Sequence, residues 1–172
     1  MTKTSSQTKR TAERDLLRHL ERLFAADDWA NREVLVQMKG SAVPPSARAL
    51  KLLNHVIGAE LHWLARLDKE PAPCAVWPDF SLHDCEEQLR SLLRKWRDWF
   101  ADLAPSDLAD SIDYVNSKGR KFLSRIDDVL THVVLHSSYH RGQIAADVRA
   151  GGGEPVLTDF IHCARSGLLD GE

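Results

Sequence analysis

Apolar side chains recur every three or four residues along four long stretches of the chain. This spacing puts them on one face of a helix, so the pattern predicts four amphipathic helices. The first ends near Gly40, the second starts after two prolines with Ser46 as its N-cap, and the third runs from an N-cap at Ser81 to Pro105. Four such helices in a chain of this length predict an all-α fold, a four-helix bundle.

The helical period breaks between the third and fourth stretches. Apolar and aromatic residues there flank the turn-forming sequence NSKG at 116–119, which predicts a small β-hairpin before the last long helix. That helix is expected to open with Ser124 as its N-cap and Asp127 as the capping-box partner, and to stop at the glycines 151–153.

Composition limits the class of protein. The chain has 172 residues, of which 43% are hydrophobic, and a chain of that size can bury about 70% of its unfolded surface in one domain. Residues 1–10 are polar and predicted to be flexible, and residues 11–172 are predicted to form the domain. Lys and Arg number 23 against 25 Asp and Glu. The chain therefore has no large positive electrostatic potential that would favour binding to a nucleic acid or an anionic membrane.

The same composition predicts a cytoplasmic location. No stretch of the chain approaches the ~18 apolar residues that a membrane span needs. The cysteines, Cys74, Cys85 and Cys163, are odd in number and widely spaced, so they form no disulfide framework and are expected as buried or incidental thiols.

Three histidines, His132, His136 and His140, follow one another at intervals of four in the last predicted helix. Each step of four rotates the side chain by only about 40° around the helix, so the three rings share one face. Apolar residues of the same face predict that it points into the bundle, where each ring needs hydrogen-bond partners or a metal. Two imidazoles four residues apart can converge on one ion.

A third ligand has to come from another helix. The second predicted helix offers His55 and His62 on one stripe, and adjacent bundle helices lie about 8–10 Å apart. The chain contains no Glu-x-x-His sequence, so the ligands of a carboxylate-bridged di-iron site are missing. The spacing therefore predicts a mononuclear site of nitrogen ligands and leaves the choice between His55 and His62 open.

Four sequences together resemble the DinB/YfiT-like superfamily of metal-binding four-helix bundles. The segment "LTHVVLHSSYHRGQIAADVRAGGGEPVLTDFI" resembles its closing signature, in which a histidine pair ends in HRGQ. "DDWANREVL", "HVIGAELHWLARL" and "DYVNSKGRKF" resemble its first helix, its second helix and its hairpin. The resemblance implies that the whole fold is a DinB-like bundle whose metal ligands are His55, His136 and His140.

Other residues near the histidine pair are not expected to be metal ligands. His132, Arg141 and Gln143 are candidates to orient the ligands, although packing of His132 and solvation of Arg141 are equally compatible with the sequence. His62 is expected to pack beside Trp63. Gly142 is costly within a helix, by about 1 kcal/mol relative to Ala, which predicts a close packing contact there.

Three imidazoles without a thiolate suit Zn²⁺ or Ni²⁺, with Fe²⁺ or Co²⁺ as alternatives, and leave a coordination position open for water or substrate. Members of the superfamily that the chain resembles include transferases and isomerases that use mycothiol or bacillithiol. The resemblance thus implies a metal-dependent thiol S-transferase that joins a low-molecular-weight thiol to an electrophilic small molecule. It also implies a homodimer.

Two alternatives to the transferase stay open. One is a hydrolase that uses a metal-bound water, and the other is a metal-binding protein that responds to damage or stress without turnover. A hydrolase would benefit from a general base, but Asp27, Asp28 and Glu60 are candidates only by their place on helices and are expected on a solvated face. The catalytic residues therefore stay unassigned. The tryptophans are expected mainly in the core or a subunit interface: Trp29, Trp63, Trp77, Trp96 and Trp99.

Overall fold

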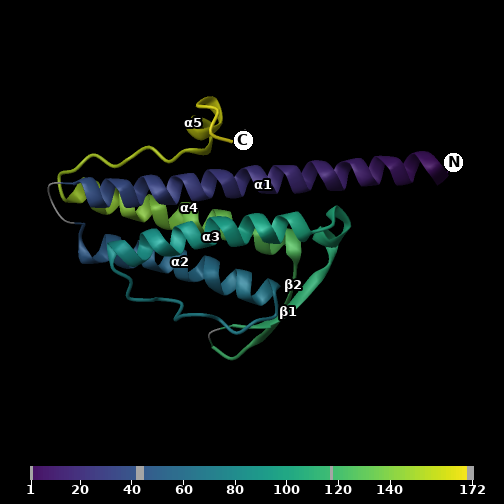
Figure 1. Cartoon of the computed structure of the whole chain (residues 1–172), viewed down its shortest axis with the longest axis horizontal. Coiled ribbons are helices and arrows are strands. Elements are labelled where there is room, and N and C mark those ends of the chain that lie inside the picture. Colours follow the sequence, from purple (N-terminus) through teal and green to yellow (C-terminus); the bar gives the residue numbers. More distant parts are fainter. Residues whose placement is uncertain (1, 42–44, 117, 170–172) are drawn as a thin grey trace.

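The computed structural model describes residues 2–41, 45–116 and 118–169 (Figure 1). Long helices make up most of it: α1 (Thr2–Gly40), α2 (Ala47–Leu67), α3 (Leu82–Asp102) and α4 (Ile126–Ala150). Shorter elements join or follow them: η1 (Pro105–Ala109), β1 (Ser111–Val115), β2 (Lys121–Arg125) and α5 (Phe160–Arg165). The predicted four-helix fold with a hairpin before the last long helix is confirmed.

Local capping signals place the starts of α2 and α3 as predicted. The backbone N–H of Ala49 donates to Ser46 Oγ at 2.9 Å, which satisfies one of the free donors at the start of α2. At the start of α3, Ser81 and Asp84 form a capping box, in which the Ser81 N–H donates to the Asp84 carboxylate at 2.8 Å.

The predicted N-cap of α4 is wrong by one residue. Ser124 lies in β2, where it pairs with Ile112 of the antiparallel partner strand. Its backbone is therefore extended and its Oγ lies 3.4 Å from the Tyr114 hydroxyl, away from the first turn of the helix. Arg125 is the N-cap instead and makes no side-chain capping bond.

The first helix reaches further than the sequence pattern suggests. It begins at Thr2, inside the segment 1–10 for which flexibility is predicted, and Leu20 is the first buried residue from position 6 onward. Figure 1 shows this N-terminal part projecting beyond the other helices. It gains little from packing, so its helical form depends on local propensity, and its flexibility stays a prediction.

The bundle encloses one main apolar core. Leu53, Val56 and Ile57 of α2 are almost inaccessible to solvent, because α2 packs against both α3 and α4. Phe24 of α1 packs against Trp96 of α3, with 4.5 Å between the ring centroids. Among the described residues, no helix has the length and apolar composition that crossing a bilayer requires.

The tryptophans and cysteines follow the predictions with one exception. Trp96 is buried, and Trp29, Trp63 and Trp99 are half-buried. Trp77 departs from the expected core position, because it is 48% exposed on the loop between α2 and α3. The thiols are all free: Cys85 and Cys163 are buried, and Cys74 is half-buried.

Candidate metal centre

Three histidines meet where α2 packs against α4. His55 comes from α2, and His136 and His140 come from successive turns of α4. One ring nitrogen of each lies within 4.8 Å of the others, and the ring centroids are 4.5–4.9 Å apart. Since Zn–N bonds are about 2.0–2.1 Å long, a small contraction would bring all three nitrogens onto one ion. The residues therefore fit a divalent transition metal.

Hydrogen bonds at the far side of two rings set their orientation. His55 Nδ1 donates to the carbonyl oxygen of Val76 at 3.0 Å, and His140 Nδ1 donates to Gln143 Oε1 at 3.1 Å. Both bonds fix the tautomer that leaves Nε2 with a lone pair, as is typical of metal-binding histidines. The orienting role predicted for Gln143 agrees with this contact.

The loop after α2 holds His55 in place. Val76 and Trp77 belong to this loop, and Trp77 stacks on the His55 ring with 3.7 Å between centroids and 6° between planes. Gly58, one turn after His55, permits the approach: a Cβ added there would lie 2.7 Å from Pro78 Cδ and 2.9 Å from the Val76 oxygen. These roles of Gly58 and Trp77 were not predicted, although a glycine inside a helix is a signal for such an approach.

The surroundings of two of the rings, His55 and His136, favour the neutral form. The pKa of His136 is lowered to about 4. Burial is the largest cause, and the neighbouring His140, His55 and His132 also contribute. Burial also lowers the pKa of His55, against the effect of its bond to Val76. Neutral imidazole is the form that binds a metal, so the environment favours ligation.

The other two histidine candidates lie outside the group. His132 is exposed, 5.5 Å from His136 and 5.4 Å from Trp63 between ring centroids. The prediction that it faces the interior is wrong, because two steps of about 40° carry its side chain away from the face of His140. His62 is half-buried and its Nε2 donates to the Cys74 carbonyl at 2.7 Å. The geometry favours His55 over His62.

Arg141, next to His140 in sequence, points into the core. Its side chain is only 6% exposed, so the solvated alternative is wrong. Its Nη1 donates to Asp27 Oδ1 at 2.6 Å and to Asn31 Oδ1 at 2.7 Å, both on α1. Arg141 therefore joins α4 to α1 directly behind the histidines and touches no ligand ring in the described hydrogen bonds.

Asn31 extends this network to α2 and α3. Its Nδ2 donates to Glu60 Oε1 at 2.9 Å, and Trp96 Nε1 donates to Glu60 Oε2 at 3.2 Å. Burial raises the pKa of Glu60 well above its ordinary value, and the nearby Asp27 adds to the effect. Arg141 is paired with Asp27 and offsets this effect on Glu60 only in part.

Asp27, Asp28 and Glu60 were predicted to lie on a solvated face, and this prediction is wrong for Asp27 and Glu60. Asp27 and Glu60 are buried, and Asp28 is half-buried in an ion pair with Arg32 at 2.5 Å. Among the described residues, no carboxylate joins the three histidines in a group placed to hold a metal. The candidate centre is made of imidazole alone.

The packing contact predicted for Gly142 is absent. This glycine is exposed, and a Cβ added to it would meet nothing within 4 Å. No packing contact of Gly142 therefore offsets the lower helix propensity of glycine.

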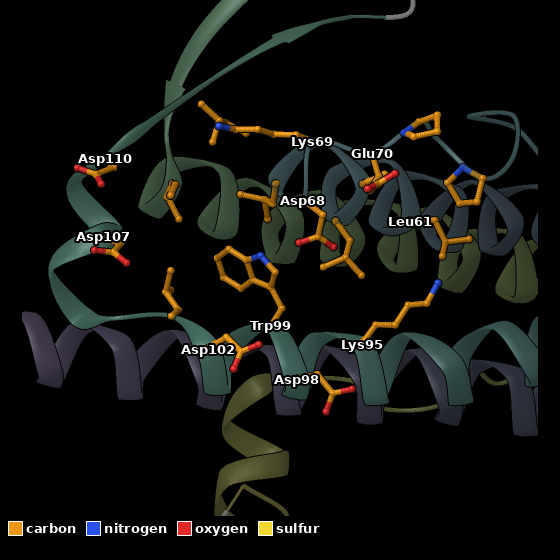
Figure 2. A pocket seen from close by; sticks show the side chains of 18 of the residues that line it. Leu61, Asp68, Lys69, Glu70, Lys95, Asp98, Trp99, Asp102, Asp107 and Asp110 are labelled. Atoms are coloured by element: carbon orange, nitrogen blue, oxygen red, sulfur yellow. The ribbon is translucent and has the colours of Figure 1, made fainter.

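A separate cavity of about 770 Å³ lies between α2, α3 and the base of the hairpin. Figure 2 shows Asp102, Asp107 and Asp110 at one end and the Trp99 indole in the middle. None of the three histidines lines it. The candidate metal centre and this acidic cavity are thus different places on the molecule.

Comparison with known proteins identifies the family of the chain. A search among curated proteins gives no match. In a comparison with models of protein families, the DinB family matches residues 2–167. This match covers both α2 and α4, which supply the clustered histidines, and almost all of the rest of the chain. The chain therefore belongs to the DinB family.

Proposed function

We propose that this chain binds one divalent transition metal ion, Zn²⁺ or Ni²⁺ in the first place, through His55, His136 and His140, and that it is a thiol S-transferase. The observation that supports the proposal best is the convergence of three imidazoles, whose ring nitrogens lie within 4.8 Å of one another. Three protein ligands leave a position for an exogenous group.

The protein residues supply orientation and the right protonation state. Val76 and Gln143 hold the rings of His55 and His140 by hydrogen bonds, and burial keeps His136 neutral. A bound divalent ion would lower the pKa of a thiol placed at the open position, so that the thiol reacts as a thiolate. The sulfur then forms a bond to an electrophilic carbon, the leaving group departs with its electron pair, and the thiol proton passes to solvent.

The position of the carboxylates favours transfer over hydrolysis. A hydrolase of this type benefits from a general base beside the ion. Asp27 and Glu60, the buried candidates, are bound to Arg141, Asn31 and Trp96. Thiol transfer needs no such base, since a coordinated thiol loses its proton near neutral pH.

Activity screening tests the proposal. Protein loaded with Zn²⁺ or Ni²⁺ is incubated with low-molecular-weight thiols and electrophiles, and in parallel with panels of esters and amides. We expect thioether formation that requires the metal and is lost in His136→Ala. Ester or amide cleavage with no thioether would favour the hydrolase, and no turnover in either panel would favour a binding protein. The homodimer and the cytoplasmic location stay predictions of the sequence.

A further inference from the structure

A row of ring contacts leads from the metal centre to the hairpin. The His136 ring lies 5.5 Å from His132, His132 lies 5.4 Å from Trp63, and Trp63 lies 5.0 Å from Tyr114 of β1, measured between centroids. The hairpin packs against the C-terminal end of α2, as Figure 1 shows. These ring contacts connect the histidines to a second polar group, the Arg66 guanidinium.

Arg66 lies against two of these rings. Its Cζ is 4.4 Å from the Trp63 centroid and 5.0 Å from the Tyr114 centroid. Among the described residues the Arg66 guanidinium donates no hydrogen bond, so its N–H groups remain for an acceptor. The aromatic rings therefore hold the side chain in one orientation without using its hydrogen-bond donors.

The charge of Arg66 has no counterion in the described part of the chain. No carboxylate there lies within ion-pair distance of its guanidinium. Other arginines do pair with carboxylates: Arg32, Arg90, Arg125 and Arg141. Burial lowers the pKa of Arg66, with Tyr114 opposing the effect. A half-buried cation that is oriented but unpaired is suited to bind an anion.

There is room for such an anion. A cavity of about 520 Å³ adjoins Arg66 and is lined by His62, Lys69, Tyr114 and Asn116, among others. Glu70 and Asp113 also line it, but neither pairs with Arg66. A carboxylate entering this cavity would replace water on the guanidinium edge with two charge-assisted hydrogen bonds.

We infer that Arg66, held by Trp63 and Tyr114, binds the carboxylate of a thiol substrate whose sulfur lies at His55, His136 and His140. The inference rests on the proposed function and narrows its substrate to thiols that carry a carboxylate at some distance from the sulfur. The body of the ligand would lie along His132 and Trp63. Arg66 would thus select the substrate without touching the reacting atoms.

Matched ligands test this role. The protein is loaded with Co²⁺, and thiol binding is followed by the cobalt–sulfur charge-transfer absorption. The probes are ω-mercaptoalkanoates of increasing length, from mercaptopropionate to mercaptoundecanoate, each compared with its carboxamide. We expect the acid to bind about tenfold more tightly than the amide once the chain is long enough to reach Arg66. Short acids should show no such preference.

Variants assign the preference to Arg66. In Arg66→Gln the acid and the amide should bind equally well, and in Arg66→Lys part of the preference should remain. Arg94→Gln, which removes an exposed arginine of α3, should bind as the wild type does. Metal content and melting temperature of each variant show whether it is folded.

Three results would each overturn the inference, and they are distinguishable. If acids and amides of every length give the same affinity, thiols bind at the metal but Arg66 does not select them. If no thiol gives the charge-transfer band, the proposed function fails and the inference fails with it. A preference that persists unchanged in Arg66→Gln would also contradict the role of this residue.

Discussion

His140 and Arg141 are neighbours in sequence with different surroundings. A step of one residue turns the side chain by about 100° around the helix, so His140 lies in the histidine cluster while Arg141 enters the core. There Arg141 bonds to Asp27 and Asn31 of α1. The arginine of the HRGQ sequence thus fixes the position of α4 behind the rings.

Removing Arg141 should destabilise the fold strongly. Arg141→Met leaves Asp27 buried without its cation, which typically costs about 3–5 kcal/mol. Urea denaturation of the metal-free protein measures the change, and Asp27→Asn in the same chain should recover part of it. The control Arg32→Gln breaks the more exposed pair with Asp28 and should cost about 1 kcal/mol or less. Equal losses in Arg141→Met and Arg32→Gln would contradict the assigned role.

At the scale of elements, the sequence predicts what local signals specify. Ser46 and Ser81 cap helices within three residues of themselves, so both starts are visible in the sequence. Ser124 looks like a cap for the same reason, but its pairing with Ile112 across the hairpin depends on a more distant residue. The six-residue helix α5 was not predicted, because it is too short for an apolar period.

Substitution by alanine should have opposite effects on stability at two glycines inside helices. Gly58→Ala brings a methyl group against the loop that carries Val76 and Trp77, so we expect a lower melting temperature and weaker metal binding. Gly142→Ala meets no neighbour and should stabilise α4 by about 1 kcal/mol, with unchanged metal affinity. Calorimetry and competition with a chelator measure both quantities. Unchanged metal affinity in Gly58→Ala would show that the loop does not position His55.

At the scale of the whole molecule, the histidine pair could be predicted from the sequence, but the residues that pack around it could not. The spacing of His136 and His140 is a property of one helix, whereas the third ligand depends on how α2 packs against α4. The resemblance to a known family selected His55, and the geometry agrees with it. The buried positions of Asp27 and Glu60 could not be predicted, because their partners come from three other helices.

The metal-free protein should lose stability in acid partly through His136. Its pKa is about 4 in the folded protein and 6.5 ordinarily, so between these values the unfolded chain binds a proton that the folded chain does not. Stability therefore falls as pH drops through this window and is unaffected by His136 above it. Urea denaturation with a chelator present should show a smaller loss in His136→Ala than in the wild type. The exposed His83→Ala is the control, and parallel curves for all three proteins would contradict this assignment.

The metal content of purified variants tests the central claim most directly. We expect about one divalent ion per chain in the wild type, because three imidazoles hold an ion that two do not. His55→Ala, His136→Ala and His140→Ala should each lose tight binding while circular dichroism shows a folded protein. His62→Ala and His132→Ala should keep the full content. Full metal content in the first three variants, or its loss in His62→Ala with retention in His55→Ala, would contradict the proposed centre.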